Sequence, residues 1–186
     1  MEKVIHVTYQ LEEQALNEQD IQNFMAHHNV ELPGEFINHY LKHNGGWPNA
    51  NWNWGIEEGI MAFTCFLSIK YGEHTIDKAI TEISKQNLGL GNRMPFAVNA
   101  LGGYYFIATD REDFGLILYA EIIPSEDGKK KLLDWKEHSK SFSDFLGGFE
   151  ADEAYGKVYV QDFDRYIDDF DAYVWENIHD MENSHL

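Results

Sequence analysis

The clearest apolar pattern near the start of the chain lies between residues 18 and 28. Side chains with apolar character recur there every three or four positions, as on one face of an α-helix; they are Ile21, Phe24, Met25 and His28. Asn17 stands immediately before this stretch. Asparagine is a preferred N-cap because its side-chain oxygen accepts a hydrogen bond from a free backbone N–H. The pattern therefore predicts a helix over residues 18–28 that begins after Asn17.

Two more helices are predicted by similar signals. The first covers residues 34–43 and follows Pro33, because a proline at the start of a helix lacks only an N–H that would have no intrahelical partner. We expect this helix to end at Asn44-Gly45-Gly46, since glycine adopts the left-handed cap conformation at little cost. The second covers residues 75–86, where one stripe of the helix is apolar; its members are Ile76, Ala79, Ile80 and Ile83.

Period-two alternation replaces the helical pattern over residues 60–69, which predicts a β-strand. Further strands are expected over residues 3–9, 95–99, 103–109, 115–122 and 132–138. Ser141 then predicts the N-cap of a short helix that ends near Leu146. Helices thus come first, mostly adjacent strands follow, and helices return. That order favours an α+β fold, with a mixed, mainly antiparallel sheet flanked by helices, over alternating βαβ units.

The last part of the chain differs in composition. Residues 150–186 hold eleven acidic and two basic residues, a net charge of −9. The segment 162–180 is still periodic, with its apolar arc formed by Phe163, Tyr166, Ile167, Phe170, Tyr173, Val174 and Ile178. The acidic residues fall elsewhere around the helix; they are Asp164, Asp168, Asp169, Asp171 and Glu176. We expect one domain over residues 1–150 and, over residues 151–186, an acidic extension with an amphipathic helix that packs on it.

Charge narrows the class of partner. The 186 residues include 32 acids and 14 bases, a net charge of −18, while 44% are hydrophobic, enough for a core. A negative field repels nucleic acid and anionic membrane surfaces and attracts basic proteins. Solubility alone is the simpler explanation of the same charge. No signal peptide or apolar span of membrane length is visible, which together with a single cysteine favours the cytoplasm.

The residues with reactive or ligating side chains predict no catalytic centre. Cys65 lies in an apolar run, so we expect a buried, unreactive thiol. His39 and His43 are four residues apart and could share a helix face, but we expect that face to be exposed, and spacing indicates no third ligand. His27-His28 is less informative still. The sequence therefore indicates no metal, no cofactor and no enzyme activity.

Tryptophan and asparagine alternate after the second predicted helix. Residues 47–55 read as a long loop with Trp47, Trp52 and Trp54. Exposed tryptophans are common anchors in protein interfaces. The alternative is that the rings fold over the sheet and complete the core. Base stacking is disfavoured because the chain lacks the basic groove that single-stranded nucleic acid requires.

Four segments together resemble the SUKH superfamily. In order they are Leu32-Pro33 with Phe36, Tyr40-Leu41 and Asn44-Gly45-Gly46; Pro95 to Ile107 with Gly102-Gly103; Gly115 to Tyr119; and Ser141 to Leu146. The resemblance covers roughly residues 20–148. It implies an α+β domain without catalytic residues, in a superfamily that includes fungal cell-wall-synthesis regulators of the SMI/KNR type and bacterial immunity proteins paired with toxins, often nucleases.

The resemblance and the charge together favour an immunity protein that binds a basic toxin domain. We expect the binding surface to be formed by Trp52, Trp54, Asp164, Asp168, Asp169, Asp171 and Glu176. The alternative is a regulatory scaffold or small-molecule-binding module of the same fold. An enzyme with an unrecognised site is a third, weaker possibility, and the sequence indicates no oligomeric state.

Overall fold

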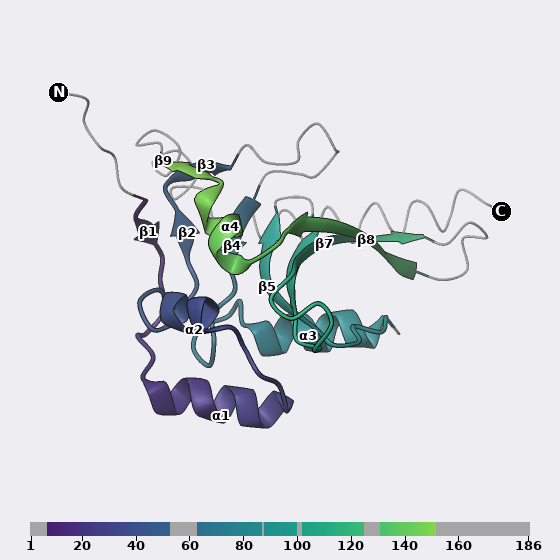
Figure 1. Cartoon of the computed structure of the whole chain (residues 1–186), viewed down its shortest axis with the longest axis horizontal. Helices are drawn as coiled ribbons and strands as arrows, with labels where there is room; N and C mark the ends of the chain where they lie inside the picture. Colours follow the sequence, from purple (N-terminus) through teal and green to yellow (C-terminus); the bar gives the residue numbers. More distant parts are fainter. Residues whose placement is uncertain (1–6, 53–62, 87, 100–101, 125–130, 152–186) are drawn as a thin grey trace.

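The computed structural model describes residues 7–52, 63–86, 88–99, 102–124 and 131–151 (Figure 1). Its helices are α1 (Glu18–His28), α2 (Gly34–Tyr40), α3 (Ile76–Lys85) and α4 (Phe142–Gly147). Its strands are β1 (Tyr9–Gln10), β2 (Trp47–Pro48), β3 (Ala50–Trp52), β4 (Phe63–Phe66), β5 (Arg93–Asn99), β6 (Tyr104–Ala108), β7 (Ile117–Pro124), β8 (Lys131–Ser139) and β9 (Phe149–Ala151). No helix in these ranges is long and apolar enough to cross a membrane.

The main sheet has five strands in the order β4-β5-β6-β7-β8, so neighbours in the sheet are also neighbours in the chain. Every pairing in it is antiparallel. Two small antiparallel pairs, β1–β2 and β3–β9, lie beside it. Within the described ranges the one parallel bridge joins Ser68 to Thr75. The predicted α+β class with a mainly antiparallel sheet is therefore confirmed.

The helix predicted after Asn17 is confirmed at both of its ends. Asn17 and Asp20 form a capping box, in which each side chain accepts a hydrogen bond from the backbone N–H of the other residue, both at 3.1 Å. The helices at residues 75–86 and 141–146 are also present, capped by Thr75 and Ser141. Local spacing and capping therefore determine these three elements.

The predicted end of α2 is wrong. The helix stops at Tyr40 with Leu41 as its C-cap in a right-handed conformation, so Asn44-Gly45-Gly46 does not terminate it. Asn44 is instead buried and joins distant segments. Its amide donates to the carbonyl oxygens of Gln14 at 2.8 Å and Ile69 at 3.1 Å, and it accepts from the N–H of Ile69 at 2.8 Å.

Two further expectations about strands need correction. The segment 47–55 is not a continuous loop, because β2 and β3 lie within it and pair with β1 and β9. Of the strand expected over residues 3–9, residues 3–6 lie outside the described ranges, and the strand in the remainder is β1 at Tyr9–Gln10. These short strands pair with segments far away in the chain, so neither follows from local alternation.

One face of the main sheet is packed with aromatic rings. Alternate residues of β6 and β7 point to this face, which we call the aromatic face; they are Tyr105, Ile107, Ile117 and Tyr119. Phe96 lies at its centre, fully buried, with the rings of Phe142 at 5.4 Å and Phe145 at 5.3 Å from its own. The helices α2 and α4 therefore close this side.

The other face carries a smaller cluster. The intervening residues of β6 and β7 point there, namely Phe106, Leu118 and Ala120, and we call it the opposite face. Ile83 of α3 and Leu88 complete the buried part. Half-buried apolar residues surround it, namely Leu90, Tyr104, Leu116, Ile122, Leu133 and Trp135.

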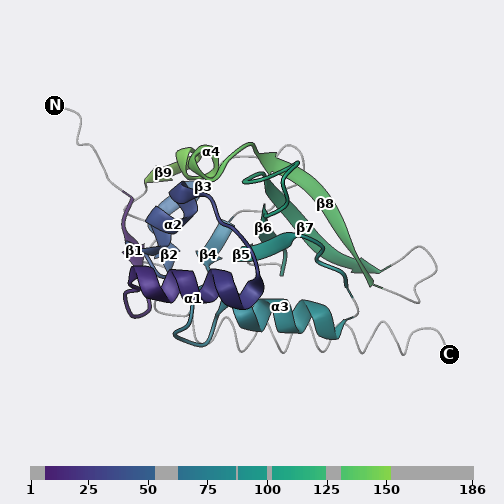
Figure 2. The same ribbon diagram turned by 60° about the horizontal axis from the view of Figure 1, so that its bottom comes forward.

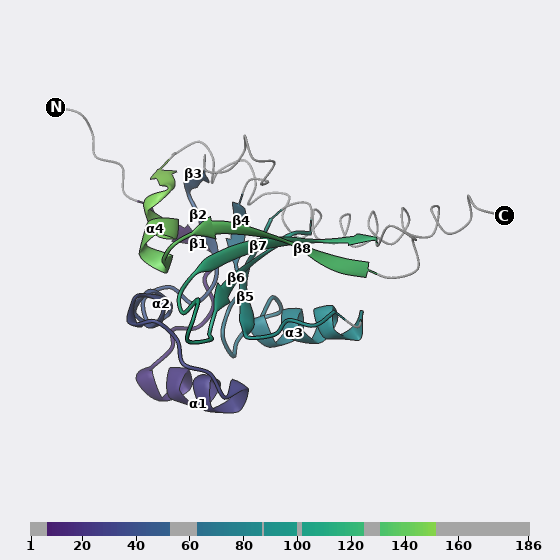
Figure 3. The ribbon, with the colours of Figure 1, turned by 45° about the vertical axis from the view of Figure 1, so that its right-hand side comes forward.

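The helices are spread along the sheet rather than stacked in one layer. Figures 1 and 3 both show α1 as the helix farthest from the β7–β8 hairpin, beyond α2. Figure 2 shows the long twist of β7 and β8, with α4 following the end of β8. The end of β8 and α4 therefore form one corner of the molecule.

Candidate functional site

A surface hollow of about 690 Å³ lies at the corner between β8 and α4. Its lining comes from the end of β8, the two turns of α4 and the start of β7; the residues are Leu116, Glu137, His138, Ser139, Lys140, Ser143, Asp144, Gly147 and Gly148. The lining therefore includes charged side chains of both signs, while most of its exposed area is apolar.

The position of α4 under this hollow is fixed from two sides. Ser141 accepts a hydrogen bond from the N–H of Asp144 at 3.0 Å, as an N-cap does. The carboxylate of Glu35, on α2, accepts from the N–H groups of Phe142 at 2.9 Å and Ser143 at 3.2 Å. These bonds satisfy backbone donors that a helix start leaves free, and they tie α4 to α2.

His138 and Ser139 form the most enzyme-like pair in the hollow, with Nδ1 of the imidazole 2.7 Å from the serine Oγ. They lie where the β7–β8 register shifts, and such bulges can redirect side chains. His138 packs edge-on against the rings of Tyr105 and Phe145, each at 5.4 Å, and burial lowers its pKa to about 4. Since both side chains are about 95% buried, their role is to complete the aromatic face.

The loop between β6 and β7 presents the second surface feature. Phe114 is 44% exposed, one of two large apolar residues so exposed in the described ranges. Acidic residues precede it in the chain, and Asp110 holds the loop by accepting hydrogen bonds from the N–H groups of Glu112 at 3.2 Å and Asp113 at 3.0 Å. Leu116, two residues further on, lines the hollow. An ordered, acidic loop with an exposed ring thus lies next to the hollow.

The sequence did not single out Phe114. The available signal was an aromatic residue in an acidic stretch, Asp110 to Gly115, between two predicted strands. A single exposed apolar residue is common on protein surfaces, so this signal by itself does not mark a contact.

The structure does not test the binding residues predicted from the sequence. The backbone of Trp52 lies in β3 opposite Phe149 of β9. Trp54 lies outside the described ranges, as does the whole predicted extension from residue 152 onward; its candidate residues are Asp164, Asp168, Asp169, Asp171 and Glu176. Their role in binding stays a prediction.

The expectation that His39 is exposed is wrong. His39 is only 6% exposed, and its ring lies 4.7 Å from that of Phe66 and 5.2 Å from that of Phe142. Burial, followed by the nearby His43, lowers its pKa to about 3. His43 stacks on Tyr9 at 4.1 Å and pairs with Glu12, with Nδ1 and Oε1 2.8 Å apart. His39 belongs to the aromatic face because β1 and β4 cover the side of α2 that was expected to be solvent-exposed.

Cys65 confirms the expectation of a buried, unreactive thiol. It is 4% exposed, and burial raises the pKa of its thiol to about 12. The thiolate is the nucleophilic form of cysteine, so at neutral pH this side chain stays protonated.

One group of possible metal ligands does come together in the described part of the chain. It consists of His27, His28 and Asp77, whose ligand atoms all lie within 4.8 Å of one another. No local pattern in the chain predicts this group, because His28 and Asp77 are 49 residues apart.

These features define a class of protein: an α+β domain around an antiparallel meander, whose buried histidines, cysteine and tyrosines take part in packing. The chain belongs to the SMI1 / KNR4 family (SUKH-1), whose family profile matches residues 15–148. That family fits a role in immunity or in regulation of the SMI1/KNR4 type, and its members are generally not enzymes. No curated protein matches the chain significantly.

Proposed function

We propose that this protein is a non-catalytic cytoplasmic binding protein that neutralises a basic, nuclease-type bacterial toxin by direct contact. The observation that carries the proposal is the net charge of −18 in a chain of this family. Nuclease domains are basic where they bind phosphates, and an acidic protein competes for such a surface. Opposite charge also speeds the encounter of the two partners.

The loop from Asp110 to Phe114 supports the proposal as a contact surface. Its exposed ring offers apolar area, while Glu112 and Asp113, both exposed, offer charge to a basic partner. The hydrogen bonds from the loop backbone to Asp110 reduce the conformational entropy lost on binding. Preorganised aromatic residues with charged neighbours are frequent anchors of protein interfaces.

The residues expected from the sequence remain part of the proposal. Trp52 and Trp54 would add aromatic anchors, and the acidic extension would add nearly half of the net charge. Its contributing residues are Asp164, Asp168, Asp169, Asp171 and Glu176. Reversing the charge of these five residues together tests the extension separately from the loop.

The decisive experiment is co-expression with the toxin encoded beside this gene, followed by purification of the complex. Protection of the cells and a stable complex are expected. Glu112→Lys with Asp113→Lys should lower the affinity for the toxin and make that affinity less dependent on salt concentration. Phe114→Ala should raise the dissociation rate of the complex. Glu82→Lys with Glu73→Lys, the same charge change at two other exposed positions, is the control. A toxin that neither binds nor is neutralised by the parent protein refutes the proposal.

The alternative is a regulatory scaffold or small-molecule-binding module of the same fold, for which the hollow between β8 and α4 is the candidate surface. A fragment screen by NMR distinguishes the two functions: ligand-induced shifts confined to the residues around Lys140 and Asp144, without toxin binding, favour the regulatory module.

A further inference from the structure

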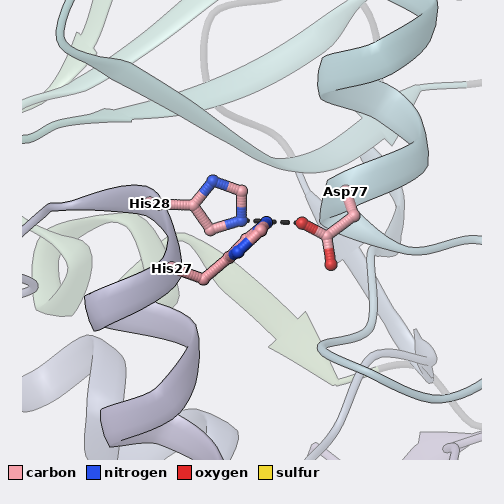
Figure 4. A group of neighbouring side chains, drawn as sticks. All are labelled: His27, His28 and Asp77. Atoms are coloured by element: carbon pink, nitrogen blue, oxygen red, sulfur yellow. Dashed lines mark hydrogen bonds and ion pairs between the residues drawn. The ribbon is translucent and has the colours of Figure 1, made fainter.

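The C-terminal end of α1 meets the first turn of α3 through three side chains that metal ions favour. Figure 4 shows the imidazoles of His27 and His28 on α1 and the carboxylate of Asp77 on α3 directed at one another. Nε2 of His28 lies 2.7 Å from Oδ1 of Asp77. One ligand atom from each of the three residues lies within 4.8 Å of the others.

The helices hold these ligands in place for reasons unrelated to a metal. The side chain of His28 is 15% exposed and packs edge-on against Phe24, with ring centroids 4.6 Å apart. Asn29, in the left-handed conformation, ends α1 directly after the two histidines. Thr75 caps α3, which places Asp77 in its first turn. Two of the three ligands are thus partly ordered before any ion binds, whereas His27 is exposed and packs edge-on against His28, with ring centroids 4.8 Å apart.

The two imidazole nitrogens and the carboxylate oxygen fit a transition-metal ion that is intermediate between hard and soft, such as Zn²⁺. Imidazole nitrogens suit Zn²⁺, Ni²⁺ and Cu²⁺, whereas Ca²⁺ and Mg²⁺ prefer oxygen ligands. Tetrahedral Zn²⁺ with bonds of 2.0–2.1 Å places its ligand atoms about 3.3 Å apart. The His28–Asp77 pair must open by roughly 0.6 Å, and His27 must approach by at most about 1.5 Å. Rotation of an exposed imidazole and an exposed carboxylate achieves both changes.

We propose that His27, His28 and Asp77 form a Zn²⁺ site that fastens α1 to α3, with water as the fourth ligand. Binding through Nε2 requires the neutral imidazole of His28 to carry its proton on Nδ1, and the ion then takes the place of the hydrogen bond between Nε2 and the carboxylate of Asp77. The overall negative charge of the chain favours capture of a cation. The inference is independent of the proposed function, since it concerns the joining of two helices within this chain.

The fastening matters because α1 is the outermost helix. A second link joins it to the segment before α3, where Nζ of Lys70 lies 2.6 Å from Oδ1 of Asp20. That ion pair holds the start of α1, whereas the three ligands hold its end. A bound ion therefore restrains the fraying of α1, and we expect it to raise thermal stability.

The test is a titration of the full chain, freed of metal by EDTA, with Zn²⁺, measured by calorimetry and by thermal unfolding. One ion per chain should bind, and the melting temperature should rise by roughly 5–10 °C at a 100-fold excess over Kd. His27→Gln removes an exposed ligand, and Asp77→Asn retains a hydrogen-bond acceptor for His28 while weakening the metal ligand. Each change should weaken binding at least about tenfold.

His43→Gln is the matched control, because it removes another histidine–carboxylate pair. In that pair Nδ1 of His43 lies 2.8 Å from Oε1 of Glu12, and no third ligand is near in the described ranges. Its affinity for Zn²⁺ should equal that of the parent. Circular dichroism confirms that each variant is folded. The proposal is overturned if Zn²⁺ fails to bind, if His27→Gln and Asp77→Asn bind it as tightly as the parent, or if His43→Gln loses affinity equally.

Discussion

The two faces of the main sheet are packed in different ways. On the aromatic face, rings from α2, β4, β5, β6 and α4 contact one another. Buried polar side chains lie among these rings and form hydrogen bonds. The buried hydroxyl of Tyr40, for instance, donates to the carbonyl oxygen of Leu67 at 2.8 Å. Among the described residues, the opposite face has a single fully buried ring, Phe106, and half-buried apolar side chains at its margin.

The difference shows which face of the sheet depends on particular side chains and their hydrogen bonds. In the part of the chain that the structure describes, burial lowers the pKa of two histidines, His39 and His138, and both belong to the aromatic face. So does the hydrogen-bonded group in which Asn99 donates to Tyr119 and Tyr119 donates to Glu121, both at 2.7 Å. Acid sensitivity and intolerance of substitution should therefore be concentrated on this face.

The largest effect is expected from Phe96→Ala at the centre of the aromatic face. It should cost about 4–5 kcal/mol of unfolding free energy, because the surrounding rings are held by several elements and cannot collapse into the cavity. Phe106→Ala on the opposite face should cost about 3 kcal/mol, since Trp135, 4.8 Å away and half-buried, is able to move. Urea unfolding measures both. Equal losses, or the reverse order, would remove the distinction between the faces.

The next effect is a loss of stability in mild acid. The unfolded chain protonates histidine near pH 6.5, whereas His39 and His138 stay neutral in the folded state down to about pH 3 and 4. The stability they contribute is complete above pH 6.5 and declines as the pH falls. Between pH 7 and 5 the loss should be about 2 kcal/mol for each histidine.

His39→Gln separates the contribution of His39 to the loss of stability in acid from the contribution of His138. It should halve the loss between pH 7 and 5, because glutamine does not titrate in that range. Unfolding free energies at several pH values measure the effect, and an unchanged slope in His39→Gln would contradict the assignment.

A smaller effect is expected at the hydrogen-bonded turn of the β5–β6 hairpin. The N–H of Gly103 donates to Oδ1 of Asn99 at 2.7 Å, and a Cβ at Gly103 would overlap the phenol of Tyr119. Gly103→Ala should therefore cost about 1–3 kcal/mol by thermal or urea unfolding. Gly89→Ala, where nothing lies within 4 Å of the added methyl group, should stay within about 1 kcal/mol of the parent. Similar values for the two variants would rule out the overlap.

The smallest effect is expected at the periphery of the aromatic face, where α1 contributes Ile21 and Phe24. Asn17→Ala removes the N-cap and should cost about 1 kcal/mol. Asn23→Ala deletes the same side chain from the exposed side of the helix and should be close to neutral, since alanine is the better helix former. A loss in Asn23→Ala as large as that in Asn17→Ala would show that capping is not the cause.

The sequence by itself determined the elements whose signals are local. The helix α1 begins after Asn17 and ends at His28 as predicted, and α4 begins after Ser141. The main strands also follow from alternation, and the burial of Cys65 follows from its apolar run. These signals succeed because helix periodicity and capping depend on residues within three or four positions of one another.

Only the tertiary structure decided which distant residues meet. Helical spacing placed His39 opposite Phe36, yet β1 and β4 enclose it. Asn44 looked like part of a helix stop, but it bonds to Gln14 and Ile69 across 30 and 25 residues. His28 finds Asp77 across 49 residues. Such pairings are set by how whole helices pack on the sheet, which no local pattern along the chain records.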